Sequence, residues 1–238
     1  MSYDQGNRWT THTAVPHVDI DAGLRQYMLR VYNYMAGGLA LTGLVAYFAS
    51  ASGIYLSLAH TPLMWVIVLA PLGLVLLLQF RINSMSLGAA QATYWAYAAL
   101  VGLSLGFIFL VYTGASIATT FFVTASMFLA MSIWGYTTKR DLSAMGSFLF
   151  MGLIGIVVAS LVNFFLHSAA LQFAISFIGV IVFTGLTAWD TQQIKEMYWQ
   201  GDGTLVAGKK AIMGALRLYL DFLNLFLMLL QFAGVRRN

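Results

Sequence analysis

Charged residues are scarce in this chain of 238 residues: 8% are Asp, Glu, Lys or Arg, while 60% are hydrophobic. A soluble globular domain carries about 25% charged residues. So few polar side chains cannot cover a globule in water, which indicates an all-α integral membrane protein. The net charge is +4, but the basic residues lie between apolar runs. They therefore predict orientation in a lipid bilayer rather than binding to nucleic acid.

Cysteine is absent, which excludes disulfides and thiolate metal sites. The four histidines lie far apart in the sequence and do not have the spacing of a metal site. The chain also lacks a Walker-type phosphate loop, an HExxH motif and a GxSxG motif. The sequence therefore predicts neither an enzyme nor a protein with a bound cofactor.

Seven apolar runs have about the length of a membrane-spanning helix, which needs roughly 20 mostly apolar residues. The runs are Tyr32–Ala51, Pro62–Phe80, Ala89–Tyr112, Ile117–Tyr136, Met145–Leu166, Leu171–Trp189 and Ile212–Phe232. Their connections are short, and the longest is Thr191–Ala211. We therefore expect a seven-helix transmembrane domain at residues 28–238, preceded by a polar, mobile tail at residues 1–27.

Lysine and arginine are distributed unevenly between the two sets of loops. They precede the first run and follow the second, fourth and sixth runs, whereas the loops at residues 52–61, 113–116 and 167–170 contain none. The positive-inside rule therefore places the N-terminus and residues 1–27 in the cytoplasm. Arg236 and Arg237 would lie outside if the last run crosses fully, and a re-entrant last segment is the alternative.

The last apolar run has a narrow polar stripe. Residues at spacings of three and four lie on one face of a helix, and here they are Gly214, Arg217, Asp221, Asn224, Met228 and Gln231. The other faces of this helix carry Leu, Phe, Tyr and Met. We therefore expect other helices to enclose it, with Arg217 and Asn224 in a polar seam beside Asp221.

Two aspartates lie within or beside the last two runs. Asp190 ends the sixth run and Asp221 lies about ten residues into the seventh, or ~15 Å along a helix. A charged Asp at mid-membrane costs roughly 2.5–3.5 kcal/mol, and such residues usually mark ion paths or proton relays. If the helices are neighbours, the two carboxyl groups would titrate as a unit and offer oxygen ligands to calcium. Alternatively, each acid caps a helix or pairs with an arginine, such as Arg217.

Arg81 ends the second run. Taken by itself, this position favours a positive-inside anchor. If the second helix converges on the sixth, Arg81 becomes a candidate partner for Asp190. Their ion pair would then be a latch that protonation of the acid releases.

Several stretches resemble the Bax inhibitor-1 family, also called the transmembrane Bax inhibitor motif family. The segments YLDFLNLFLMLLQF and TAWDTQQIK resemble its signature, and KRDLS at Lys139–Ser143 matches its loop after the fourth span. The segment Leu24–Gly43 is similar to the bacterial members. Trp189 stands where the family usually has Tyr before the first Asp. The resemblance covers nearly the whole chain.

The resemblance implies a seven-helix fold in which the other six helices surround the last one. It implies a di-aspartyl pH sensor at Asp190 and Asp221, with Arg81 paired to Asp190. The function implied is a pH-sensitive calcium leak channel of the bacterial inner membrane, with calcium bound by the two acids as the ion that passes. Other bacterial relatives are described as binding partners or modulators of a membrane-bound AAA protease. The alternative function is therefore regulation of such a protease without transport, with the partner bound to residues 1–27. A proton-coupled transporter would need an internal repeat, which the sequence does not reveal.

Overall fold

The computed structural model describes residues 17–59 and 61–237, and this part of the chain is helical apart from short connections. The helices are α1 (His17–Ala51), α2 (Ile54–Ala59), α3 (Leu63–Arg81), α4 (Leu87–Leu105), α5 (Ile108–Val111), α6 (Gly114–Thr137), α7 (Ser143–Leu166), α8 (Ala169–Glu196) and α9 (Thr204–Ala233). Seven segments are long and apolar enough to cross a membrane, with α4 and α5 together forming one of them. The predicted all-α membrane fold with seven spans is confirmed.

Three of the spanning helices begin at a serine or threonine that caps them. The hydroxyl oxygens of Ser86, Thr113 and Ser168 accept hydrogen bonds from backbone amides three residues later, at 3.2, 3.3 and 3.3 Å. The first amides of a helix have no partner within it, and a lipid environment offers none. These caps therefore fix where α4, α6 and α8 begin.

The helices extend beyond the apolar runs around the last connection. α8 continues to Glu196 and α9 already begins at Thr204, so most of the predicted linker Thr191–Ala211 is helical. Gln192 explains part of this extension: its side chain accepts a hydrogen bond from the amide of Leu142 at 2.9 Å and donates one to the carbonyl of Arg140 at 2.8 Å. A helix can therefore extend past its apolar run where its polar side chains form hydrogen bonds inside the bundle.

α1 begins at His17, inside the range predicted as a tail at residues 1–27. Tyr27 and Met28 are buried in the core, so the bundle already encloses the helix at the expected boundary. The candidate span that contains them starts at Ala22. The predictions for residues 1–16 lie outside the described residues.

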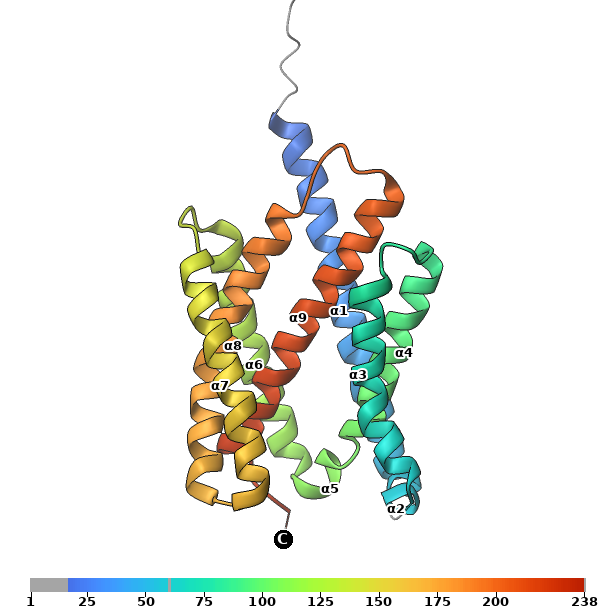
Figure 1. The fold of residues 1–238 in the computed structure, drawn as a ribbon, viewed down its shortest axis with the longest axis vertical. Helices are drawn as coiled ribbons and strands as arrows, with labels where there is room; N and C mark the ends of the chain where they lie inside the picture. Colours follow the sequence, from blue (N-terminus) through green and yellow to red (C-terminus); the bar gives the residue numbers. More distant parts are fainter. Residues whose placement is uncertain (1–16, 60, 238) are drawn as a thin grey trace, which may run out of the picture.

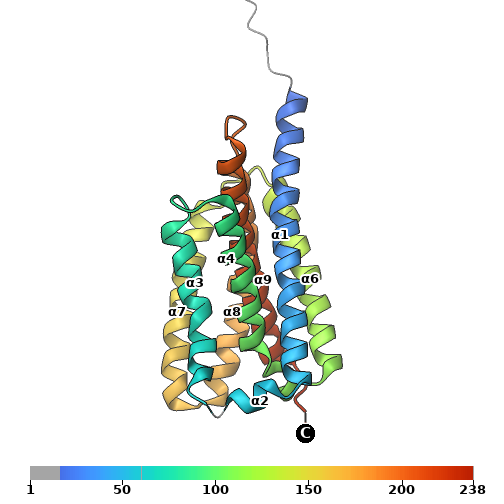
Figure 2. The same ribbon diagram turned by 90° about the vertical axis from the view of Figure 1, so that its right-hand side faces the viewer.

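The last helix occupies the centre of the bundle. α9 packs against α8, α1, α6 and α4, while α3 covers α4 and α7 covers α8 (Figures 1 and 2). Within its most apolar stretch 56% of α9 is buried, against 11% for the span of α3 and 17% for that of α7. The expected central position of α9 is confirmed, with α3 and α7 as an outer layer.

Two glycines permit the close packing around α8. A β-carbon at Gly135 of α6 would collide with the backbone carbonyl of Ala188. A β-carbon at Gly214 of α9 would come within 3.0 Å of the side chain of Ile194. Small residues allow helices in lipid to approach closely, and here they bring α6 and α9 against α8 on either side of Asp190.

α9 crosses the whole bundle rather than re-entering. It begins at the end where α1 begins and finishes toward the opposite end, the end at which α5 lies (Figure 1). The chain after α9 is held there by hydrogen bonds from the amide of Arg237 to the carbonyl of Val111, at 2.8 Å, and from the amide of Thr113 to the carbonyl of Val235, at 3.1 Å. Arg236 and Arg237 therefore lie at the opposite end from Lys139 and Arg140.

Candidate functional site

α8 and α9 bring Asp190 and Asp221 together. The two carboxyl groups lie within hydrogen-bonding reach of each other between the two helices. Asp221 is 5% exposed, and the side chain of Asp190 is 14% exposed. The pair is thus enclosed by protein, and Asp190 is its more accessible member.

The Oδ2 atom of Asp221 is buried, and no group of the described residues donates a hydrogen bond to it when both acids are ionised. An ionised carboxylate only accepts hydrogen bonds, so two ionised carboxylates in contact cannot satisfy each other. Buried polar atoms without a partner are rare in proteins. A proton or a cation between the two groups would supply what the arrangement lacks.

Arg217 is the ion-pair partner of Asp190. Its Nη1 atom lies 3.8 Å from Oδ1 of Asp190, and the Arg217 side chain is 46% exposed. Asp221 is one turn after Arg217 on the same helix, where an intrahelical pair was the alternative expectation. A base that precedes an acid by four residues is the weaker of the two orders, and Arg217 instead reaches across to α8. The partly exposed guanidinium group of Arg217 thus lies between the acidic pair and the outside of the bundle.

Arg81, the residue that the resemblance pairs with Asp190, does not form that ion pair in this structure. Its side chain is exposed at the end of α3, and the two ion pairs of the described residues are Lys210–Asp202 and Arg217–Asp190. The reason is the layering: α3 packs on α4 in the outer layer and away from α8. The loop after α3 is instead joined to α9 by Lys209, whose Nζ donates a hydrogen bond to the carbonyl of Asn83 at 3.0 Å.

Lysines close the end of the bundle near the acidic pair by binding backbone carbonyls. Lys195 donates to the carbonyl of Tyr136 at 2.8 Å and lies 5.2 Å from the centre of its ring. Lys210 donates to the carbonyl of Met197 at 2.9 Å and forms an ion pair with Asp202 at 2.6 Å. Carbonyls at the end of a helix lack partners within it. These lysines therefore stabilise the end of α6 and the turn between α8 and α9.

A chain of hydroxyl groups joins α1 and α6 to α8 immediately after Asp190. Thr191 donates to the carbonyl of Thr187 at 2.7 Å, Ser132 lies 2.9 Å from Thr191, and Tyr32 lies 2.5 Å from Ser132. Because the proton of Thr191 is already donated, Ser132 must donate to Thr191 and Tyr32 to Ser132. Sequence reasoning missed this chain because single hydroxyls in apolar runs are common, and no spacing relates residues on three different helices.

The polar stripe of α9 continues beyond the acids. Asn224, predicted in the seam with Arg217, is half-buried one turn after Asp221. At the far end of the helix Gln231 belongs to a second polar group, the amide cluster, which consists of Asn163, Gln172, Ser176 and Gln231. Gln172 donates to Gln231 at 2.6 Å, and Asn163 donates to Gln172 at 3.0 Å. The Ser176 hydroxyl donates to the backbone carbonyl of Gln172 at 2.9 Å and lies 3.3 Å from the side-chain oxygen of Gln231.

The acidic pair offers a cation a small number of ligands. The described residues contain no group of three or more His, Asp or Glu side chains arranged to hold a metal ion. Calcium in a storage site takes six to eight oxygen ligands. Two carboxyl groups supply at most four oxygen atoms, so a calcium ion held here would need further oxygen ligands from the backbone or from water.

Similarity to other proteins extends over nearly the whole chain. The profile of the family described as "Inhibitor of apoptosis-promoting Bax1" matches residues 24–238. The inner membrane protein YbhL of Escherichia coli K12 is 54% identical over 220 residues, 91% of this chain and 94% of that protein. A protein of Rickettsia prowazekii is 51% identical over 230 residues, 96% of this chain and 98% of its own length. A membrane protein of Streptococcus pyogenes is 36% identical over 226 residues, 92% of this chain and 97% of its own length.

The family profile spans α8 and α9, where Asp190 and Asp221 lie, and the relatives are bacterial proteins of nearly the same length. The motifs around Asp190 and Asp221, the seven spanning helices and the family profile thus agree. The chain belongs to the Bax inhibitor-1 family of membrane proteins.

Proposed function

We propose that this protein is a pH-sensitive calcium leak channel of the bacterial inner membrane, in which the Asp190–Asp221 pair controls passage of the ion. The observation that carries the proposal is the buried Oδ2 of Asp221, which has no partner beside a second carboxyl group. Buried acids of this kind usually mark ion paths or proton relays. The inner-membrane location rests on the E. coli relative YbhL.

The charges of the site give the proposed mechanism. When the pair holds one proton, its remaining negative charge is balanced by Arg217, which lies 3.8 Å from Asp190. A second proton, taken up on acidification, neutralises Asp190 and removes this attraction. Arg217 is then released to water, and the contact between α8 and α9 near Asp190 loosens. In the proposed mechanism Arg217 takes the latch role that the resemblance assigns to Arg81.

Protonation has a second, opposing effect. The same carboxyl oxygens are the ligands that a calcium ion meets at this point, and a protonated carboxyl group binds a cation weakly. Acidification would therefore open the helix contact while weakening the ion's interaction with the pair. We expect calcium flux to pass through a maximum as the pH is lowered rather than to rise continuously.

Calcium flux into liposomes that contain the purified chain tests the proposal. The variants Asp190→Asn and Asp221→Asn keep the size of each side chain and remove its titration, so we expect both to alter the flux and flatten its pH profile. Asp202→Asn is the matched control, because Asp202 is an acid in the turn before α9 that pairs with Lys210. If both site variants keep the wild-type pH profile, or if the control changes it equally, the proposed mechanism is wrong.

A second candidate function is the modulation of a membrane-bound AAA protease without transport. The first turns of α1 project beyond the neighbouring helices (Figure 2), where a partner can reach them. Deletion of residues 2–22 should then abolish the interaction, measured by copurification with the protease, and spare calcium flux. A protein whose only function is the leak would show no interaction to lose.

A further inference from the structure

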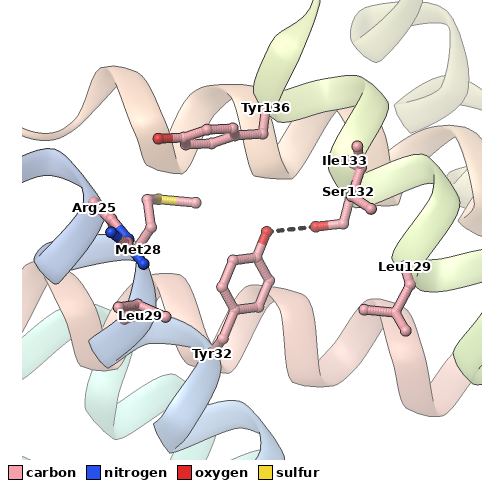
Figure 3. A pocket seen from close by; sticks show the side chains of 8 residues that line it. All are labelled: Arg25, Met28, Leu29, Tyr32, Leu129, Ser132, Ile133 and Tyr136. Carbon is pink, nitrogen blue, oxygen red and sulfur yellow. Dashed lines mark hydrogen bonds between the residues drawn. The ribbon is translucent and has the colours of Figure 1, made fainter. Parts of the chain in front are cut away.

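A groove opens between α1 and α6 at the end of the bundle near the acidic pair (Figure 3). Its volume is about 520 Å³. α1 contributes Arg25, Leu29 and Tyr32 to its lining, and α6 contributes Leu129, Ile133 and Tyr136. Both helices pack on α9 more than on each other, so the space between them stays open toward the outside of the bundle. The hydrogen bond between Tyr32 and Ser132 crosses it (Figure 3).

The groove changes in character along its length. Arg25 and Tyr136 lie at the end near the start of α1 and the end of α6. Seven residues deeper on each helix are Tyr32 and Leu129, which corresponds to about 10 Å at 1.5 Å per residue. The walls in between are apolar and include the exposed side chains of Leu29 and Ile133. One cation at the mouth and an apolar channel behind it match an amphiphile with an anionic head.

Arg25 forms no ion pair with the acidic side chains that the structure describes. Its side chain is exposed, and the two ion pairs of the described residues are Lys210–Asp202 and Arg217–Asp190. Lys139 and Arg140, just after α6, are exposed at the same end, and with Asp141 beside them they add one net positive charge. An arginine binds a phosphate through several donors of its planar guanidinium group. The positive charge at the mouth therefore favours a partner with a net negative charge, and the guanidinium group favours one whose charge is on a phosphate.

We propose that this groove is a binding site for an anionic phospholipid. Its phosphate binds Arg25, and one acyl chain lies along Leu29, Leu129 and Ile133. Free phosphate would not contact the apolar walls of the groove, whereas a lipid without a charged head group would leave Arg25 without a partner. The surrounding bilayer supplies such lipids at high local concentration, and basic residues near its surface attract them.

The lipid-binding groove lies close enough to the acidic pair to influence it, although neither aspartate lines the groove. A chain in the groove lies over the Tyr32–Ser132 hydrogen bond, and Ser132 continues to Thr191, the residue after Asp190. The lipid would therefore contact the hydroxyl chain that ties α1 and α6 to α8. Lipid binding itself does not depend on calcium conduction, so the two proposals can fail separately.

The test measures bound phosphatidylglycerol on the full chain by native mass spectrometry, after reconstitution in phosphatidylcholine nanodiscs that contain a small fraction of phosphatidylglycerol. We expect Arg25→Gln to weaken phosphatidylglycerol binding about fivefold, the effect of one basic residue near an anionic membrane surface. Arg30→Gln is the matched control, because Arg30 is also exposed on α1 but lines a different groove with Asn33 and Trp95. It should change binding less than twofold.

A second variant tests the apolar part of the groove without changing charge. Ile133→Trp fills the channel and should also reduce phosphatidylglycerol binding several-fold, whereas Val158→Trp, on the exposed face of α7, should leave it unchanged. The proposal is overturned if Arg25→Gln and Arg30→Gln weaken binding equally, if Ile133→Trp has no effect, or if phosphatidylcholine binds as tightly as phosphatidylglycerol. Binding of free inorganic phosphate with the same Arg25 dependence would assign the mouth to phosphate rather than to a lipid.

Discussion

α8 and α9 carry two polar clusters at opposite ends of their contact, and the two are built in opposite ways. The amide cluster of Asn163, Gln172, Ser176 and Gln231 is uncharged, and its amides and hydroxyl pair donors with acceptors. The acidic cluster of Asp190, Asp221 and Arg217 sets two acceptor groups against each other and leaves one buried oxygen without a partner. Both clusters use the polar stripe of α9.

The difference indicates what each end is suited to do. A satisfied network of neutral groups holds helices together in lipid, although each hydrogen bond contributes only about 0.6 kcal/mol on average. Two adjacent carboxyl groups instead need a proton, a cation or the guanidinium group of Arg217 to coexist. Their helix contact therefore depends on the surrounding solution, whereas the contact at the amide cluster does not. Substitutions in the acidic cluster should therefore change the pH dependence of the protein, whereas substitutions in the amide cluster should change only its stability.

The largest effect on stability is expected from Asp221→Asn. This change replaces a buried acid, which must take up a proton before it can donate to Asp190, by an amide that donates a hydrogen bond without binding a proton. We expect the free energy of unfolding, measured by titration with a denaturing detergent at neutral pH, to rise by about 2 kcal/mol, within the cost of leaving a buried polar group unsatisfied. The reciprocal control is Gln231→Glu, which introduces an acid into the amide cluster and should lower stability. A loss of stability in Asp221→Asn would mean that the acidic pair is a structural contact like the amide cluster.

A smaller effect is expected from Gln172→Ala in the amide cluster. Gln172 donates to Gln231 and accepts from Asn163, so its removal breaks both of these bonds. At about 0.6 kcal/mol each, the loss of stability should be about 1 kcal/mol, with the pH profile of calcium flux unchanged. Gln193→Ala is the control, because the Gln193 amide bonds to Glu196 one turn away on an exposed surface. A changed pH profile in Gln172→Ala would contradict the division of roles between the two ends.

Much of the fold follows from the sequence because lipid restricts the possible structures. A chain that crosses a bilayer must satisfy every backbone group within a helix, so runs of about 20 apolar residues define the spans. The polar stripe around Asp221 likewise predicts a central helix, since charged and amide groups would face lipid anywhere else. The ends of α8 and α9 are less predictable from composition, because Thr191 and Gln192 are polar and yet buried between helices.

The contacts of the site are harder to predict because they depend on which helices are neighbours. The spacing of residues places Arg217 one turn from Asp221, but it does not reveal that Asp190 lies closer to its guanidinium group. The family resemblance directs attention to Arg81, which lies in the outer layer in this conformation. Local spacing determines which residues share a face of one helix, whereas the layering of α3 on α4 and of α9 on α8 determines which faces meet.

The smallest expected effect separates the two arginines. Arg217→Gln removes the ion pair with Asp190, and because Arg217 is 46% exposed, that pair should contribute at most about 1 kcal/mol. Calcium flux at neutral pH should therefore rise by no more than about fivefold, since 1.4 kcal/mol corresponds to tenfold in an equilibrium constant.

Arg81→Gln is the matched control for this measurement, with the same loss of charge at an exposed helix end. We expect it to leave flux at neutral pH unchanged, because Arg81 lies outside the ion pair with Asp190. The opposite result, with Arg81→Gln raising flux and Arg217→Gln having no effect, would mean that α3 moves against α8 in the closed channel. Asp190 would then pair with Arg81 in the closed conformation and with Arg217 in the conformation described here. The pH-dependent contact would in that case include α3 as well as α8 and α9.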